Sequence, residues 1–199
     1  MPELKNTIIY LIGIPAVGKY TTARAIARRT GAKVVDNHLI NNPIFSVAHV
    51  DGTSRFPFPV EGWRYTGRIR RTVLTFIRDL GHPDDSFIFT NVMGEDEIRG
   101  FQQIERLAKR RKALFVPVWL KCKPAELRRR KDTPQRRRMM KEVELSNIRF
   151  WTREFRELDV LHPNRLVIDN TDLKPAHTAR LILDHTEYCR RSNGSKKRN

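Results

Sequence analysis

The sequence lacks the features that define several large protein classes. Its longest apolar runs fall far short of the roughly 18 residues that a membrane-spanning helix needs. The first residues, MPELKNT, contain no apolar region of the kind found in secretion signals. Cysteine is nearly absent, and Cys122 and Cys189 are too few for a disulfide scaffold. These absences argue against the membrane, secreted and fibrous classes and predict a cytoplasmic location.

Acidic residues are few relative to basic ones. The chain has 22 Asp+Glu against 39 Lys+Arg, which gives a formal net charge of +17 at pH 7. This charge predicts acidic partners such as nucleotides, phosphorylated metabolites or nucleic acid. Hydrophobic residues make up 39% of the 199 residues, enough for the core of one compact domain. We therefore expect a single domain over residues 1–189 and a disordered basic tail over residues 190–199.

Short apolar runs alternate with helical patterns along the chain. The runs predict five strands, at residues 7–13, 33–36, 86–92, 113–120 and 165–169. Helical patterns occupy residues 19–29, 62–80, 98–107, 124–130 and 173–188, with a further stripe at Ile148, Trp151, Phe155 and Leu158. Residues 37–59 are rich in turn-forming residues and predict mostly loop, with room for one short helix.

This order of elements indicates the fold class. Repeated strand–helix–strand units form a parallel sheet with helices on both of its faces. The sequence thus predicts an α/β fold, a three-layer α/β/α sandwich around a five-stranded parallel sheet. Proline disrupts central strands, so Pro117 predicts a bulge or a local sheet edge within the fourth strand.

A glycine-rich loop connects the first predicted strand to the first predicted helix. Residues 13–19, GIPAVGK, fit the pattern G-x-x-x-x-G-K of phosphate-binding loops. In such a loop Gly13 and Gly18 let the backbone curl, so that successive N–H groups surround phosphate oxygens. The helix that begins at Lys19 adds the positive end of its dipole, and the Lys19 ammonium can reach the β- and γ-phosphates. The loop therefore predicts a binding site for a polyphosphate.

The residue after the lysine departs from this pattern. Ser or Thr normally stands there and ligates Mg²⁺ through its hydroxyl, whereas this chain has Tyr20. Thr21 comes next and can supply a hydroxyl, directly or through water. We therefore expect Thr21 to be a metal ligand.

The loop resembles that of adenylate kinases, which read G-x-P-x-x-G-K-x-T and match Pro15 and Thr21. Adenylate kinases carry glycine at the positions of Ala16 and Tyr20, so the resemblance is to the broader P-loop small-molecule kinases, which include shikimate and gluconate kinases. It implies binding of ATP and Mg²⁺ and transfer of the γ-phosphoryl group. The nucleotide-binding residues that it implies in this loop are Gly13, Pro15, Ala16, Val17, Gly18, Lys19, Tyr20 and Thr21.

Asp36 ends the second predicted strand, in the sequence VVDNH. Ligands of parallel sheets gather at the carboxyl ends of the strands, so we expect Asp36 beside the phosphate-binding loop. A carboxylate there can orient or deprotonate an acceptor hydroxyl, or hold Mg²⁺ through water. The resembling kinases have an acidic residue at this place that contacts metal or acceptor. Alternatively, Asp36 caps a short helix at residues 37–39. The neighbouring His38 is interpreted as polar surface.

Arginines on the helix at residues 62–80 are candidates for binding the acceptor. Arg64 and Arg68 lie on one face of that helix because they are four residues apart. The resemblance implies that one of them holds an acidic group of the acceptor. A solvated basic face is the alternative.

A second basic segment predicts a lid. Residues 128–138 contain seven Lys/Arg, and a mobile loop of arginines over about residues 128–141 can close on a nucleotide and stabilise a transferring phosphoryl group. The resemblance implies that Arg130 packs on the adenine and that Arg136 or Arg137 contacts the phosphates. Asn170, after the fifth strand, is a candidate for hydrogen bonding to the base, or else a helix cap.

Together these features predict a P-loop phosphotransferase. It would move the γ-phosphoryl group of ATP, with Mg²⁺, onto a small hydroxyl- or phosphate-bearing acceptor, with Lys19 on the phosphates and Asp36 on the acceptor. Two alternatives stay open. The net charge of +17 favours a polynucleotide 5′-kinase, and Tyr20 favours a non-catalytic protein that binds nucleic acid in a nucleotide-dependent way.

Overall fold

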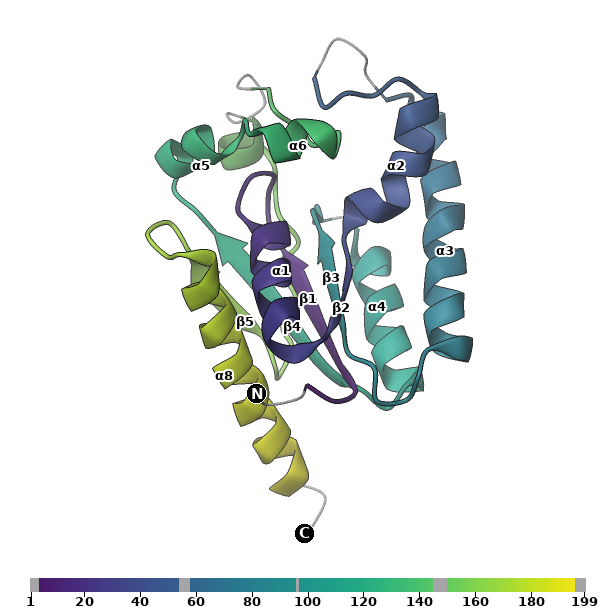
Figure 1. Cartoon of the computed structure of the whole chain (residues 1–199), viewed down its shortest axis with the longest axis vertical. Coiled ribbons are helices and arrows are strands. Elements are labelled where there is room, and N and C mark those ends of the chain that lie inside the picture. The colour runs from purple at the N-terminus through teal and green to yellow at the C-terminus, as the bar shows by residue number, and fades with distance from the viewer. Residues whose placement is uncertain (1–3, 54–57, 96, 145–149, 196–199) are drawn as a thin grey trace.

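The computed structural model describes residues 4–53, 58–95, 97–144 and 150–195, which form an α/β fold (Figure 1). At its centre lies a five-stranded sheet in which all neighbouring strands are parallel. The strands are β1 (Thr7–Ile12), β2 (Lys33–Val35), β3 (Phe87–Asn91), β4 (Leu114–Lys121) and β5 (Leu166–Asp169). Their order is β2-β3-β1-β4-β5, and every residue of the central strand β1 is buried. The predicted sheet is confirmed.

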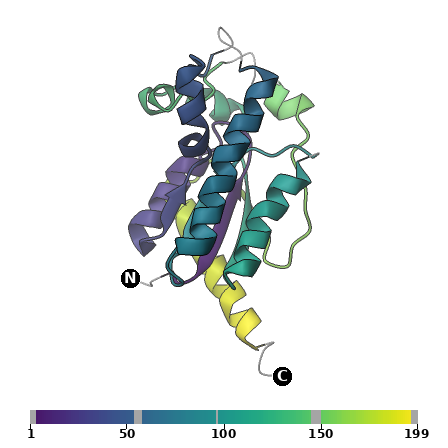
Figure 2. The same cartoon turned by 90° about the vertical axis from the view of Figure 1, so that its right-hand side faces the viewer.

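Helices cover both faces of this sheet (Figure 2). They are α1 (Lys19–Thr30), α2 (Asn37–Val47), α3 (Trp63–Leu80), α4 (Ile98–Arg110), α5 (Pro124–Arg130), α6 (Pro134–Arg138) and α8 (Pro175–Ser195), with the short turns η1 (Val60–Gly62) and η2 (Phe150–Glu154). On one face, Ile26 of α1 and Ile182 of α8 share a core with Ile9 of β1. On the other, Phe101 of α4 shares a core with Tyr10. Because side chains of a strand alternate between faces, β1 contributes to both cores, and the three-layer sandwich is confirmed.

Helix α2 is the main difference from the sequence-based expectation. Residues 37–59 predict mostly loop, yet Asn37–Val47 forms a helix of 11 residues with Pro43 inside it. Ile40 and Phe45 of this helix are buried. Tertiary packing therefore stabilises a helix whose local sequence favours turns.

Three smaller points concern the other elements. The stripe that begins at Ile148, outside the described residues, predicts a helix, whereas its described part is the π-helical turn Phe150–Glu154. α8 continues to Ser195, so residues 190–195 are helical rather than part of a disordered tail. The register of β4 is continuous across Pro117, and pairing with β5 begins only at Val118, so Pro117 lies at a local edge of the sheet.

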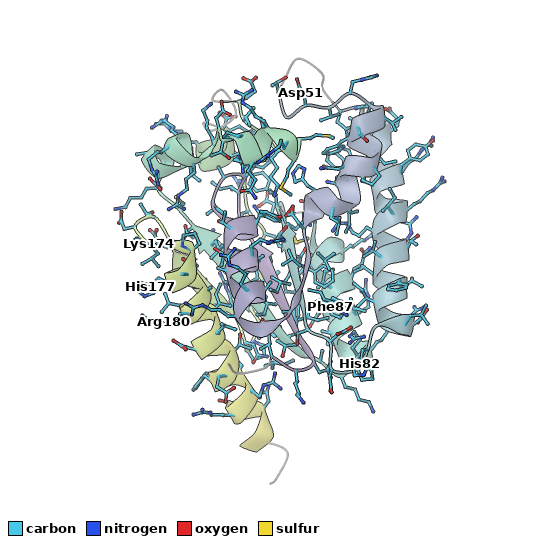
Figure 3. All side chains as sticks on the ribbon, in the orientation of Figure 1. Asp51, His82, Phe87, Lys174, His177 and Arg180 are labelled. Carbon is cyan, nitrogen blue, oxygen red and sulfur yellow. The ribbon has the colours of Figure 1, made fainter. Side chains whose placement is uncertain are left out.

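The carboxyl ends of the strands all point toward α5 and α6, which carry most of the predicted lid segment and are called the lid helices below. α5 and α6 lie across this end of the molecule, above the start of α1 and facing α2 (Figure 1). Asp51 lies at the same end and His82 at the opposite one (Figure 3). Across the described ranges, no helix combines the length and the apolar character needed to span a bilayer.

Candidate active site

A cavity of about 760 Å³ opens at the carboxyl ends of the strands. Its walls come from the β1–α1 loop, the start of α2, the end of β3, the lid helices and the β5–α8 loop. The lining residues that the sequence singled out are Pro15, Ala16, Gly18, Lys19, Tyr20, Thr21, Asp36, Arg130, Arg136 and Asn170. Residues far apart in the chain therefore meet where parallel sheets bind their ligands.

The β1–α1 loop curls tightly through left-handed backbone conformations. Gly13, Ala16 and Gly18 have φ values of 154°, 65° and 102°. A Cβ on Gly13 would lie 2.7 Å from the carbonyl oxygen of Leu120, so no other residue fits there without a shift of β4. Ala16 holds its positive φ although it has a Cβ, which is a strained conformation typical of functional loops. The loop thus has the curled shape that wraps an anion.

The N-terminus of α1 is open to a ligand. Gly18 occupies its N-cap position, no side chain caps it, and its first turn contains no acidic residue. The first N–H groups of a helix have no partner within it and attract anions. The Lys19 ammonium donates to the carbonyl oxygens of Gly13 (2.5 Å) and Ile14 (2.9 Å) and so lies along the loop. Burial and the nearby Lys141 ammonium lower the pKa of Lys19 to about 7, against the attraction of Asp36.

Arg130 and Asn170 brace the loop from the other side. The amide of Asn170 donates to the carbonyl oxygen of Val17 (2.8 Å), and Arg130 lies 3.4 Å from the same oxygen. Arg130 also donates to the backbone oxygens of Asn170 (3.0 Å) and Thr171 (2.8 Å), and Glu126 accepts from its Nε (2.6 Å). The two residues implied for the nucleotide base therefore meet, and they tie the lid and the β5–α8 loop to the phosphate-binding loop.

Asp36 is held by two side chains that the sequence did not point to. It occupies the N-cap position of α2, but its side chain makes no capping hydrogen bond. Its carboxylate instead accepts from Thr90 Oγ1 (2.6 Å) and pairs with Lys141 Nζ at 2.9 and 3.3 Å. Burial pushes the pKa of Asp36 upward, but Lys141 and Thr90 together hold it below its usual range. Asp36 is thus a buried, ionised carboxylate that faces the cavity, and the capping alternative does not hold.

The lid arginines separate into two groups. Arg136 is half-buried, lines the cavity and donates to the carbonyl oxygens of Lys131 (2.7 Å) and Glu142. Within the described residues, Arg137 is not part of the cavity wall, and its guanidinium forms an ion pair with Asp132. Of the two arginines implied for the phosphates, Arg136 is therefore the one beside the cavity.

Comparisons with known proteins identify the architecture. No family model and no curated protein matches the sequence. Solved structures do match, among them a gluconokinase from Sinorhizobium meliloti 1021, with a TM-score of 0.63 at 12% identity over 98% of this chain and 99% of that one. APS kinase CysC from Mycobacterium tuberculosis, solved with AMPPNP and APS, gives 0.58 at 14% identity over 94% and 99%. Shikimate kinase from Acinetobacter baumannii, solved with shikimate, gives 0.50 at 15% identity over 89% and 90%.

The chain has the P-loop kinase fold. The likeness covers nearly the full length of both chains in each comparison, so it extends well beyond the loop motif. At identities of 12–15% it establishes the fold alone, and the chemistry depends on the residues of this cavity.

The P-loop kinase fold implies a magnesium ion, but the donors here do not fit one. Thr21 Oγ1 is exposed and donates to the carbonyl oxygen of Gly18 (2.9 Å). Both carboxylate oxygens of Asp36 already face the ammonium of Lys141, whose charge repels a divalent cation. The side chain that replaces the usual Ser or Thr is Tyr20, and its ring lies beneath the same ammonium, 4.5 Å away. Among the described residues, no three His, Cys, Asp or Glu side chains form a metal-binding group. The predicted ligand pair, Thr21 and Asp36, is therefore not arranged to hold Mg²⁺.

Of the described arginines on α3, Arg70, rather than the predicted Arg64 or Arg68, contacts a residue of the cavity wall. Arg64 bonds the hydroxyl of Tyr65, and Arg68 lies over the Tyr65 ring, so both are exposed on the outer face of α3. Arg70 points inward and donates to the side-chain oxygen of Asn37, which lines the cavity. Arg70 belongs to the same basic stretch, and only the packing of α3 against α2 distinguishes it from its neighbours.

His38 is part of the cavity wall rather than polar surface. Asn42 donates its amide to the carbonyl oxygen of Met139, so its Oδ1 faces His38 and accepts from Nδ1 (3.1 Å). Burial and the nearby Lys141 ammonium lower the pKa of His38 to about 4. A neutral histidine therefore lies next to Asp36, with α2 in contact with the lid through Asn42.

Proposed function

We propose that this protein is an ATP-dependent phosphotransferase that moves the γ-phosphoryl group onto a small hydroxyl- or phosphate-bearing acceptor. One observation carries the proposal. The uncapped N-terminus of α1 lies beside the partly buried ammonium of Lys19, and Lys141 and Arg136 are close enough to contribute to the lowered pKa of Lys19. Crowded positive charge costs free energy that a bound anion relieves. A polyphosphate chain is the ligand whose length and charge fit such a row of donors.

The loop and the lid would share the work of binding ATP. The amides of residues 13–19 and the dipole of α1 hold the β- and γ-phosphates, together with Lys19. Arg130 and Asn170 lie on the side of the cavity where the base would sit. Arg136 is the lid guanidinium positioned to stabilise the charge of the transferring phosphoryl group. Residues 128–141 would act as the lid that excludes water.

The reaction itself needs little covalent help from the protein. The acceptor hydroxyl oxygen forms a bond to the γ-phosphorus, and the bond from that phosphorus to the bridging oxygen breaks, so that ADP leaves with the electron pair of that bond. The hydroxyl proton passes to the Asp36 carboxylate late in the step, when the new bond to phosphorus has made the hydroxyl acidic. A carboxylate with a lowered pKa is a weak base, so Asp36 suits orienting the acceptor hydroxyl more than deprotonating it early. Asn37, His38 and Asn91 line the acceptor side and offer uncharged hydrogen-bonding groups. These groups suit a small acceptor that carries hydroxyl or other hydrogen-bonding groups.

The test is a phosphotransfer assay with ATP and a panel of hydroxyl-bearing acceptors, with and without Mg²⁺. Lys19→Ala should abolish transfer, whereas Lys33→Ala should keep it, because Lys33 pairs with Asp85 on the surface at the amino end of the sheet. Unchanged turnover in Lys19→Ala would contradict the proposal. A 5′-hydroxyl oligonucleotide in the panel tests the polynucleotide-kinase alternative, and ATP binding without transfer to any acceptor tests the non-catalytic one. A cytoplasmic location stays a prediction from the sequence.

A further inference from the structure

Lys141 is a buried lysine that no sequence motif accounts for. It is 8% exposed, and its ion-pair partner Asp36 is 4% exposed. Its Nζ lies 2.9 Å from Asp36 Oδ2 and 4.5 Å from the centre of the Tyr20 ring. Moving a lysine ammonium out of water costs free energy, which must be offset by interactions of its charge with other groups.

The Lys141 ammonium lies between the side chains of Tyr20 and Asp36. Tyr20 directly follows Lys19 in the first turn of α1, and Asp36 follows β2 at the edge of the same cavity. A group held between these two side chains lies next to the phosphate-binding loop. These are the two positions at which a phosphate-binding site of this architecture would place a metal ligand and an acidic residue. In this chain the Lys141 ammonium occupies the space between these two residues.

The surroundings of Lys141 suit an ammonium and not a divalent ion. An aromatic ring attracts a monovalent cation through its negative face, but the phenol of Tyr20 does not take the place of a small aliphatic hydroxyl ligand. The ammonium has three N–H donors, and the carboxylate of Asp36 accepts two of them at most. At least one donor is not taken by the carboxylate, and because Lys141 lines the cavity, its charge is within reach of a bound anion.

We propose that the Lys141 ammonium takes the place of the protein-held metal ion beside the polyphosphate. This inference rests on the proposed function, because it assumes that the cavity binds a nucleoside triphosphate. It makes ATP binding by this chain largely independent of Mg²⁺. The cation would then come from the lid, because Lys141 is the last residue of the predicted lid segment at residues 128–141.

The backbone around Lys141 is fixed on both sides. Val143 N–H donates to the carbonyl oxygen of Gly52 (2.9 Å), and Lys131 Nζ donates to the carbonyl oxygen of Val143 (2.8 Å). On the lid side, Asn42 of α2 donates to the carbonyl oxygen of Met139 (3.2 Å). The segment that carries Lys141 is therefore held in place by hydrogen bonds to Gly52 and to Asn42.

Calorimetric titration of ATP into the full chain tests the inference, once in EDTA and once with Mg²⁺. For the wild type, the two dissociation constants should agree within about threefold. Lys141→Met should weaken binding in EDTA by about tenfold or more, which is the loss of one charged hydrogen bond. Lys109→Met is the matched control, because it removes an exposed lysine of α4 that pairs with Glu105 within its own helix.

A rescue variant sharpens the test. Lys141→Met combined with Tyr20→Thr restores a hydroxyl beside Asp36, and Mg²⁺ should then strengthen ATP binding by about tenfold or more. Circular dichroism confirms folding, and Asp36→Asn/Lys141→Met serves as the cation-free variant should the single variant unfold. The inference is overturned if wild-type binding depends on Mg²⁺ as strongly as binding by the rescue variant. If the wild type binds ATP in neither buffer, the proposed function fails and this inference fails with it.

Discussion

The backbone of Gly52 lies directly against the carbonyl group of Lys141. A Cβ on Gly52 would stand far inside van der Waals contact with that oxygen, and Gly52 has a φ of 86°. Asp51 fixes the turn by accepting from the N–H (2.9 Å) and the hydroxyl (2.7 Å) of Thr53. The turn at residues 51–53, after α2, thus packs against the backbone of Lys141 and fixes its position.

Gly52→Ala should therefore displace Lys141 as well as strain the turn. We expect the free energy of unfolding to fall by about 2–4 kcal/mol, from the positive φ together with the clash. Gly31→Ala is the control, because Gly31 has a similar φ of 73° but no atom within 4 Å of the place that a Cβ would take, so it reports the cost of φ alone. ATP affinity should fall in Gly52→Ala only. Equal losses of affinity in the two variants would show that this contact does not position Lys141.

The buried pair of Asp36 and Lys141 should show strong coupling in a double-mutant cycle. Asp36→Asn leaves an ammonium without its carboxylate in a buried site, and we expect a loss of about 3 kcal/mol in urea unfolding. Lys141→Met leaves the carboxylate with its hydrogen bond from Thr90 but without its cation, and should cost a comparable amount. The double variant should recover about 1–3 kcal/mol relative to the sum of the two single losses. Additive losses would mean that the ion pair contributes no coupling.

Arg130 should matter for stability and for nucleotide binding together. Arg130→Ala removes the bonds to Val17, Asn170 and Thr171, so the phosphate-binding loop loses its brace. We expect about 1–3 kcal/mol less stability and roughly tenfold weaker ATP binding in calorimetry. Arg128→Ala, two residues earlier on the exposed side of α5, should change stability by less than about 0.5 kcal/mol. If Arg130→Ala and Arg128→Ala bind ATP with the same affinity, Arg130 does not support the phosphate-binding loop in the way proposed.

The sequence was sufficient for the sheet and for the phosphate-binding loop, because both depend on local patterns. A short apolar strand followed by a helix, or glycines at fixed spacing before a lysine, can be recognised within about ten residues. It was insufficient for α2, whose turn-forming Asn41, Asn42 and Pro43 are overridden by packing of Ile40 and Phe45. Local propensity is a weak guide wherever tertiary contacts decide.

The electrostatic centre of the site could not be predicted in the same way. Lys141 and Asp36 are 105 residues apart in the chain, and Thr90 and Asp36 are 54 apart. Their meeting depends on strand order and on the path of the lid. Dense basic segments also offer too many equivalent side chains, so Arg70 and Arg136 can be separated from Arg68 and Arg137 only by their orientation. The roles of all these residues in binding and catalysis stay predictions.

His38 should make folding stability depend on pH below neutrality. In the unfolded chain its pKa is near 6.5, whereas in the folded chain burial and the Lys141 ammonium lower the pKa to about 4, against the attraction of Asp36. Between these values the unfolded state binds more protons, so the free energy of unfolding falls as pH drops from 6.5 toward 4. At pH 5 this contribution amounts to about 2 kcal/mol.

Urea unfolding at pH 7 and pH 5 measures this contribution directly. His38→Gln keeps a donor toward Asn42 but cannot be protonated, so its loss of stability between the two pH values should be smaller than that of the wild type by about 2 kcal/mol. His177→Gln, on the exposed face of α8 (Figure 3), should retain the wild-type loss because this side chain is in contact with solvent in both states. Parallel loss in His38→Gln and the wild type would mean that His38 is protonated as easily in the folded chain as in the unfolded one, which the cation beside it opposes.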